Sequence, residues 1–338
     1  MIPERADGAR RPAPPLMMSS GFLVLGVVLF FAFSIVFAGC AITGDRDHDW
    51  EFFEGMIGPP YTMPSLNGLS GLAKSPEGQL WAASEGGELI RLGQHGEVGP
   101  KARIRELDPS FEIEALTFLA NGDFVLGTEV DRERSSDVIL LARASADGDE
   151  LEIYRHLLFD YSLWDISPPP DQGVEGICNT GTAILAVSEA TEVRGETRYA
   201  PLGSWDIASG RWDAYWIELS SETGKLAGLT CRTSAHGVEF VAIERDFGVA
   251  HILHGSLTGA SGGGADEKTI RPDLVLDWSG IAQNLEGVAW IDRDRLYVLD
   301  DNYYKSSKSG SSRLWTVMSE ALSQTDRSEF APAAPHVP

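Results

Sequence analysis

Positive charge is scarce in this sequence. Its 338 residues include 27 Lys and Arg against 50 Asp and Glu, which gives a formal net charge of −23 at pH 7. Polyanions repel such a chain, so we expect neither nucleic acid nor anionic lipid headgroups as partners. The composition remains compatible with divalent cations, and also with an acidic surface that serves only solubility.

The sequence also lacks the residue patterns of several catalytic classes. It contains no Gly-x-Ser-x-Gly elbow for a serine nucleophile, because the match to that pattern at residues 259–263 lies in a Gly- and Ser-rich run expected to be a flexible loop, and it contains no Cys-x-x-Cys pair. Its histidines show no zinc spacing, because His251 and His254 are three residues apart in a predicted strand and would face opposite sides. These absences argue against a serine triad and against a zinc centre.

The first forty residues have the order of a bacterial lipoprotein signal. Three arginines lie within the first eleven residues, residues 21–38 carry no charge, and Ala38 and Gly39 precede Cys40. A positive segment, an apolar segment and a small-residue cleavage site are typical of an exported chain. We therefore expect a signal peptide over residues 1–39 and a lipid on Cys40.

An uncleaved membrane anchor is the alternative, since eighteen apolar residues can just span a bilayer core of about 30 Å. In both cases we expect residues 40–47 to be a linker and the body to lie in the cell envelope, facing the periplasm or the outside. Ala41 provides no acidic signal for retention at the inner membrane, which favours the outer membrane.

The remaining cysteines, Cys178 and Cys231, leave two states open. They could form a disulfide in an oxidising compartment. Each lies inside an apolar run, however, where a free buried cysteine is common. We therefore expect free thiols and keep the disulfide as the alternative.

A short apolar motif with a small central residue recurs five times in the chain. Its copies are residues 68–73, 112–117, 173–178, 225–230 and 284–289. The central residues are Gly71, Ala115, Gly176, Gly228 and Gly287, at intervals of 44, 61, 52 and 59 residues. This spacing, with a turn and further strands after each copy, is that of propeller blades.

The repeats predict an all-β protein, a β-propeller over residues 48–318. We expect five blades if each motif opens one, and six if a long interval hides a degenerate repeat. Residues 50–57 would form the outer strand of the last blade and close the ring, because closure removes exposed sheet edges. Residues 319–338 would be a disordered tail.

Acidic residues recur at fixed places in these repeats. Glu114, Glu175 and Glu286 hold the same place in their motifs, where the other two copies have Ser70 and Ala227. The strands that follow the motifs end in Glu85, Glu129, Glu189, Glu244 and Asp300. Equivalent positions of innermost strands point toward one axis, and a hard cation such as Ca²⁺ relieves the repulsion between carboxylates gathered there.

We therefore name Glu114, Glu175, Glu286 and Asp300 as candidate metal ligands. The alternative is that these acids cap strand ends and recur only because the fold recurs.

Two further clusters supply candidate catalytic and binding residues. In Glu244-Arg245-Asp246, the arginine could form a structural ion pair or offer a bidentate fork to a phosphate. Asp300-Asp301-Asn302 is the densest group of oxygen ligands, and Lys305 lies just beyond it. We name Glu244, Arg245 and Asp301 as candidate catalytic residues, and Asn302 and Lys305 as candidate ligand contacts.

The five motifs and these two clusters resemble the bacterial family called "esterase-like activity of phytase", over about residues 66–317. The resemblance implies an exported propeller, often a lipoprotein, and hydrolysis of esters or phosphoesters by analogy with calcium-dependent phytases. The chain departs from a phytase because it has no dense set of Lys and Arg to hold a polyphosphate.

Two functions follow. In the first, carboxylates in the channel mouth hold Ca²⁺ for phosphoester hydrolysis, and Arg245 steadies the anion. In the second, a non-catalytic envelope propeller binds a small anionic ligand, a glycan or an envelope protein.

Overall fold

The computed structural model describes most of the predicted propeller domain. The described residues are 57–63, 66, 68–130, 136–168, 170–235, 237–257, 261–262, 268–280, 284–301 and 311–318. Several sequence predictions lie outside them: the signal peptide, Cys40, the 40–47 linker, Asn302, Lys305 and the 319–338 tail. None of the helices in the described part is long and apolar enough to cross a membrane.

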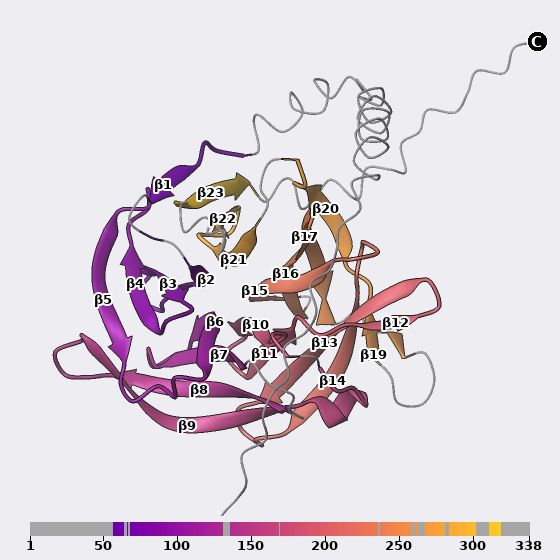
Figure 1. Ribbon diagram of the computed structural model, residues 1–338, viewed down its shortest axis with the longest axis horizontal. Coiled ribbons are helices and arrows are strands. Elements are labelled where there is room, and N and C mark those ends of the chain that lie inside the picture. Colours follow the sequence, from indigo (N-terminus) through magenta and orange to yellow (C-terminus); the bar gives the residue numbers. More distant parts are fainter. Residues whose placement is uncertain are drawn as a thin grey trace, which may run out of the picture. The chain divides into compact units, whose positions relative to one another are not determined.

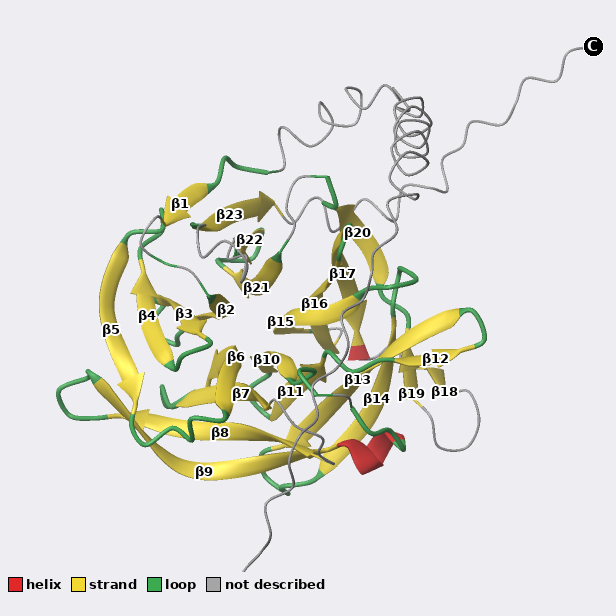
Figure 2. Cartoon of the chain, viewed as in Figure 1, coloured by secondary structure: helices red, strands yellow, loops and turns green. Residues whose placement is uncertain are grey.

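Strands make up most of the described chain (Figure 2), and antiparallel pairing groups twenty of them into five four-stranded units. We call these units blades 1 to 5. Blade 1 is β2 (Leu69–Lys74), β3 (Leu80–Ser84), β4 (Glu88–Leu92) and β5 (Val98–Ile104). Blade 2 is β6 (Phe111–Phe118), β7 (Phe124–Val130), β8 (Ser136–Ala144) and β9 (Glu150–Asp160).

The other three blades contain the remaining principal strands. Blade 3 is β10 (Val174–Asn179), β11 (Ala183–Ser188), β13 (Thr197–Asp206) and β14 (Trp212–Glu218). Blade 4 is β15 (Lys225–Ser234), β16 (Gly237–Asp246), β17 (Val249–Ser256) and β20 (Asp273–Asp277). Blade 5 is β21 (Leu285–Trp290), β22 (Arg295–Asp300), β23 (Ser312–Met318) and β1 (Tyr61–Met63).

Short elements supplement the blades. β12 (Glu192–Arg194) forms a hairpin with β13, and β19 (Lys268–Ile270) pairs in parallel with β14 and carries β18 (Ser261–Gly262). A parallel pairing also joins β5 to β9. A 3₁₀ turn, η1 (Tyr161–Trp164), follows β9.

The five innermost strands form a closed ring. β2, β6, β10, β15 and β21 contact one another in this order, and β21 contacts β2 (Figure 1). The ring closes through the start of the domain, because β1 pairs with β23 and Ile57 bridges Val317. The all-β propeller and its closure by an N-terminal strand are therefore confirmed, although the closing strand is Tyr61–Met63 and only Ile57 of residues 50–57 is described.

The core consists of five hydrophobic clusters, one in each seam between neighbouring blades. The alternation of strand side chains explains this arrangement. Along β16, Val241 and Ile243 pack toward blade 5, whereas Phe240 and Ala242 pack toward blade 3. Both faces of the inner blade strands are thus buried, which is why these strands read as continuous apolar runs.

Each recurrent motif occupies an innermost strand and contains a β-bulge. The pairing register shifts beside all five small residues, and the extra residue at each shift is Ser70, Glu114, Glu175, Ala227 or Glu286. A Cβ added at Gly176 would lie 2.7 Å from the backbone nitrogen of Leu229 in the next blade. Only a small residue therefore fits, as predicted.

Ala115 is the one alanine at this position. Its side chain fits because the residue that pairs with it is a glycine. Its partner on β7 is Gly127, whereas the partners of Gly176 and Gly228 are Val187 and Ile243. The glycine provides the space that the extra methyl group needs.

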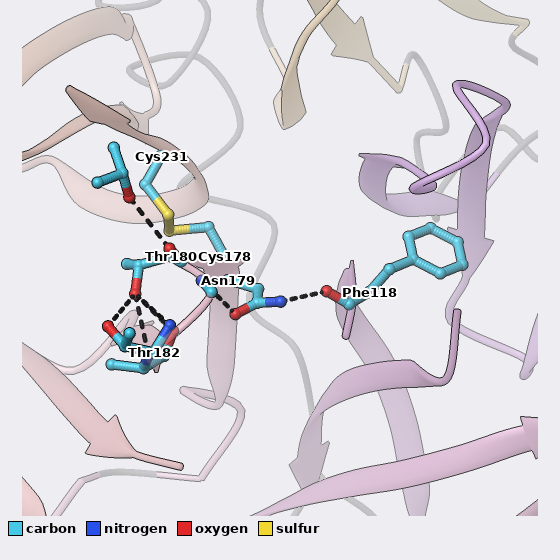
Figure 3. The surroundings of a disulfide bond; sticks show 9 residues. Phe118, Cys178, Asn179, Thr180, Thr182 and Cys231 are labelled. Carbon is cyan, nitrogen blue, oxygen red and sulfur yellow. Dashed lines mark hydrogen bonds between the residues drawn. A yellow bond between two sulfur atoms is a disulfide. The ribbon is translucent and has the colours of Figure 1, made fainter. Parts of the chain in front are cut away.

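The structure corrects the expectation of free thiols. Cys178 on β10 and Cys231 on β15 form a disulfide, with a Cα–Cα distance of 5.7 Å (Figure 3). Each follows the small residue of its motif by two or three positions, so neighbouring inner strands bring them together. Beside this bond, Asn179 Nδ2 donates to the carbonyl of Phe118 at 2.8 Å, and Thr233 Oγ1 donates to the carbonyl of Thr180 at 3.0 Å.

Candidate metal centre

Seven buried or half-buried carboxylates gather at the end of the ring where the inner strands begin, and the exposed Glu112 lies beside them. We call this the carboxylate end, and its members the carboxylate cluster: Glu85, Glu114, Glu129, Glu175, Glu189, Glu286 and Asp301. All except the half-buried Glu85 are only 3 to 9% exposed. Four of the five blades contribute a member.

The bulges explain how three of these acids reach the centre. Glu114, Glu175 and Glu286 are each the extra residue at the bulge of their strand. A bulge locally turns the strand and redirects its side chain. The three acids lie close enough to interact, because the charge of Glu114 acts on Glu175 and the charge of Glu286 acts on Glu114.

Three members of the cluster could hold one cation together. Glu129, Glu175 and Glu189 each offer an oxygen, and these three oxygens lie within 4.8 Å of one another. Glu129 also belongs to a second such group with Glu112 and Glu114. Carboxylate oxygens are the ligands that Ca²⁺ prefers, and its flexible coordination suits an irregular set of this kind.

Two cations face the cluster. Nη2 of Arg245 lies 3.0 Å from a carboxylate oxygen of Glu286 and 3.9 Å from one of Glu189. Nζ of Lys225 lies 3.4 Å from the other oxygen of Glu189. Two positive charges cannot neutralise seven acids. The excess negative charge at the carboxylate end must therefore be offset by a further cation or by protonation of some of the acids.

The pKa values of the acids reflect their burial and this excess of negative charge. Burial, reinforced by the charges of neighbouring acids, raises the pKa of Glu114 and of Glu175 well above the usual value. Burial also raises the pKa of Glu129. For Glu286 burial outweighs the opposing charge of Arg245 and raises the pKa to about 8. The same acids raise the pKa of Arg245 against the effect of its burial, so the guanidinium stays charged.

Hydrogen bonds fix two of the acids between blades. Oδ2 of Asp301 accepts from the backbone N–H of Gly68 at 3.0 Å, and its Oδ1 accepts from Oγ of Ser312 at 2.6 Å. Oε2 of Glu129 accepts from the N–H of Gly173 at 3.1 Å. In both cases a carboxylate at the end of a second strand holds the start of the next blade's inner strand.

The structure places Glu244 away from the cluster. Its Oε2 accepts from the N–H and Oγ of Ser220, and its Oε1 accepts from the N–H and Oγ of Ser221. The side chain is fully buried. Burial tends to raise its pKa, but hydrogen bonds from His251, Ser220 and Ser221 lower it to about 2. The expectation that Glu244 shares a cation with the cluster is therefore corrected, because both of its oxygens accept hydrogen bonds from Ser220 and Ser221.

Asp300 is also separate from the centre. It accepts from Nε of Arg313 at 2.9 Å and from Nη2 of the same guanidinium, and it is fully buried. Burial raises its pKa, although Arg313 opposes the effect. The expectation that Asp300 shares a cation with the cluster is corrected, because its Oδ2 forms an ion pair within blade 5, while its Oδ1 has no hydrogen-bond partner among the described residues.

Both corrections have one cause. Leu226 pairs with Glu244 and Leu285 pairs with Asp300, whereas Ile113 and Val174 pair with Thr128 and Ser188. Glu244 and Asp300 are thus equivalent to the residues before Glu129 and Glu189. A shift of one residue moves a strand side chain to the opposite face. Arg245 and Asp301 are the true counterparts of Glu129 and Glu189.

Four residues of the carboxylate end are not among the candidate ligands or catalytic residues named from the sequence: Glu85, Glu129, Glu189 and Lys225. Glu85, Glu129 and Glu189 follow a hydroxyl residue at the end of an apolar strand, as Ser84-Glu85, Thr128-Glu129 and Ser188-Glu189. Aligning this pair with Glu244-Arg245 and Asp300-Asp301 could have found the correct register. Lys225 begins its motif and shows no distinguishing signal beyond that place.

A family model described as phytase-like, "esterase-like activity of phytase", matches residues 64–303. The chain belongs to this family. The matched span of this phytase-like chain runs from just before β2 to just beyond Asp301, and so contains every member of the carboxylate cluster. No curated protein sequence matches the chain.

Several solved structures share the general architecture at low identity. The PQQ-bound aldose sugar dehydrogenase of Streptomyces coelicolor is 13% identical, with a TM-score of 0.47, over 78% of this chain and 98% of that chain. Regucalcin, a calcium-binding protein from Agrobacterium tumefaciens, is 17% identical, with a TM-score of 0.41, over 74% and 76%. The PQQ domain of pyranose dehydrogenase from Coprinopsis cinerea is 8% identical, with a TM-score of 0.41, over 76% and 94%. Likeness at this level supports no argument about the site.

Proposed function

We propose that this phytase-like chain is a calcium-dependent phosphoesterase whose reaction takes place at the carboxylate end. One observation carries the proposal: Glu129, Glu175 and Glu189 bring three carboxylate oxygens within 4.8 Å of one another, and Arg245 lies beside the same cluster. The family description, which names esterase-like and phytase activity, supports the reaction class.

The residues at this end have three roles: binding the cation, orienting the phosphate and donating a proton. Glu129, Glu175 and Glu189 hold the cation, which when bound would offset phosphoryl charge and activate water. Arg245 keeps its charge and offers a planar fork, so it orients the phosphate. Glu286, with a pKa of about 8, carries a proton at neutral pH and lies 3.0 Å from Arg245. It is therefore placed to donate a proton to the leaving oxygen.

The first test is thermal melting of the purified full-length chain in chelator and in millimolar calcium. A cation that binds only the folded state stabilises it by RT ln(1 + [L]/Kd), so we expect the melting temperature to rise by roughly 5 °C or more. Glu175→Gln should remove most of this rise. Glu152→Gln is the matched control, because Glu152 is an exposed glutamate on β9 of the same protein.

The second test is hydrolysis of p-nitrophenyl phosphate. We expect phosphate release that requires calcium, is lost in Glu175→Gln and is strongly reduced in Arg245→Lys. The lysine keeps the charge but loses the fork, so Arg245→Lys should retain the calcium-dependent melting. Stabilisation by calcium without any hydrolysis would eliminate the catalytic part of the proposal.

That outcome would favour a second function, a non-catalytic cation-binding propeller of the envelope. The observation behind it is the depth of the site, since Glu175 and Glu189 are only 3% and 7% exposed. A cation fits such a depth more easily than a phosphoester does. Equal melting with and without calcium would eliminate both functions.

We also propose that the chain is anchored to the envelope by lipid on Cys40, with its body in the periplasm at the outer membrane or outside. The charge pattern of residues 1–39 and the position of Cys40 support this. Cys40→Ser should abolish labelling with fatty acid and leave an unprocessed precursor. Normal processing and labelling of that variant would contradict the proposal.

A further inference from the structure

The opposite end of the ring contains a pocket of about 710 Å³. Residues of all five inner strands line it, together with the turns that lead from these strands into the second strands. We call it the far-end pocket. None of the seven acids of the carboxylate cluster lines it, so it is a separate space.

The far-end pocket is positively charged in an acidic protein. Five charged side chains line it: Lys74, Arg232, Arg293, Glu239 and Asp292. Both acids are already paired, because Glu239 accepts from Nε of Arg232 at 2.9 Å and Asp292 accepts from Nη2 of Arg295 at 2.6 Å. Lys74 and Arg293 have no carboxylate within 4.0 Å among the described residues. Two positive charges therefore remain without a counter-ion.

Hydrogen bonds position Lys74 and the turn that carries Arg293 at one side of the pocket. Nζ of Lys74 donates to the carbonyl of Ile291, across the seam between blades 1 and 5. The carbonyl of Arg293 accepts from Nη1 of Arg232 at 2.7 Å, which fixes the turn that carries Arg293. Lys74 thus contacts the turn of blade 5 to which Arg293 belongs.

The rest of the wall offers hydroxyl groups and aromatic surface. Thr117 and Thr230 are half-buried on β6 and β15, and neither hydroxyl makes a hydrogen bond to another described residue. The ring of Trp290 is 8% exposed and lies 4.1 Å below the guanidinium carbon of Arg232. Phe118, 6% exposed, lines another part of the wall.

We propose that the far-end pocket binds a small organic anion, a carboxylate or phosphate attached to a compact apolar group. Lys74 and Arg293 bind the oxyanion, because charge-assisted hydrogen bonds to free cations are the strong ones. The threonine hydroxyls add hydrogen bonds, and Phe118 and Trp290 contact the apolar group. This site does not depend on calcium or on the proposed hydrolysis.

The disulfide provides an independent readout of occupancy. Cys178 and Cys231 both line the pocket, and Cys231 is half-buried, so a soluble thiol can reach the bond from this side. A ligand in the far-end pocket shields it. Binding therefore slows reduction of the disulfide in the native protein.

The experiment is calorimetric titration of the full-length chain in chelator with phenyl phosphate, benzoate and inorganic phosphate. Chelator removes any contribution from a calcium-bound carboxylate end. We expect phenyl phosphate or benzoate to bind and to slow the reduction of the disulfide by dithiothreitol. Inorganic phosphate, which has no apolar group, should bind more weakly.

The variants locate the site. Lys74→Met with Arg293→Gln should weaken binding roughly tenfold or more and remove the protection of the disulfide. Lys101→Met with Arg103→Gln, exposed residues on β5, is the matched control and should leave both unchanged. Absence of binding by both organic anions, equal loss in the control, or inorganic phosphate binding as tightly as phenyl phosphate would each overturn the proposal.

Discussion

The two ends of the ring are made by the same five strands and have opposite chemistry. At the carboxylate end seven acids face Arg245 and Lys225, whereas at the far end Lys74 and Arg293 lack any acidic partner in the described chain. The far end also has a covalent link between blades 3 and 4. The fold supplies equivalent positions at both ends of the ring. The residue at each position decides the charge found there.

The ends also differ in what stabilises them. The carboxylate end accumulates like charges that are expensive to bury, and the disulfide at the far end constrains the chain without any charge. Solution conditions should therefore act on the two ends separately.

Removing the disulfide should have the largest effect of any substitution. Cys178 and Cys231 are 53 residues apart, and the chain-entropy model gives about 4 kcal/mol for a loop of this length. Cys178→Ala with Cys231→Ala should lower the free energy of unfolding in urea by about that amount, equally in chelator and in calcium. A loss that calcium abolishes would show that the two ends are coupled.

The pH dependence should report the carboxylate end. The folded-state pKa values of Glu114, Glu175 and Glu286 are raised, so between about pH 4.5 and 8 the folded protein binds more protons than the unfolded chain. In chelator the contribution of these groups is full below pH 4.5, and that of Glu286 is lost as the pH rises through about 8, which for this one group is on the order of 5 kcal/mol. Urea unfolding at stepped pH measures it.

Calcium should flatten that slope, and so should Glu175→Gln with Glu286→Gln, because amides do not titrate. Glu152→Gln again provides the control. A free energy of unfolding in chelator that rises from pH 5 to pH 8 would contradict the buried, protonated cluster.

Glu244→Gln should cost about 2 kcal/mol at pH 7, because the charged carboxylate accepts hydrogen bonds from both Ser220 and Ser221. The sign of its pH dependence is opposite to that of the cluster. Its folded-state pKa is lowered to about 2, so its contribution is present above pH 4.5 and is lost as the pH falls through about 2. Wild type and variant should converge in urea unfolding near pH 2.

The smallest effects concern the glycines between the two ends. An added Cβ at Gly176 would meet three atoms at 2.7 Å, whereas at Gly228 the nearest atom is 3.0 Å away. We expect Gly176→Ala to cost about 1.5 kcal/mol and Gly228→Ala about 0.5 kcal/mol. Chemical unfolding distinguishes them, and the reverse order would show that blade 3 yields more easily than blade 4.

The repeats made the ring predictable from sequence. Five copies of one motif implied equivalent strands, and the small central residues implied crowding between them, as Gly71 and Gly287 demonstrate. The inward place of Glu114, Glu175 and Glu286 followed from the same equivalence.

The side chains at the ends of the second strands were harder to place from sequence, because no local pattern fixes the pairing register of a second strand with its inner strand. The end of an apolar run suggested Glu244 and Asp300, but pairing with Leu226 and Leu285 decides which neighbour faces inward. The disulfide was missed for a related reason. An apolar surrounding suits a free thiol and a buried disulfide equally, and only the contact between β10 and β15 distinguishes them.

Closure of the ring by β1 has a consequence for the order of assembly. Thr62 pairs with Arg313, so one of the first segments to be synthesised must wait for one of the last. Until then blade 5 lacks its outer strand and Asp301 lacks the backbone of Gly68. Joining the two ends of the chain costs conformational entropy before these contacts can stabilise the ring. We therefore expect closure to be a late and slow event in folding. A stalled or truncated chain would expose the edge of β23 to other molecules instead.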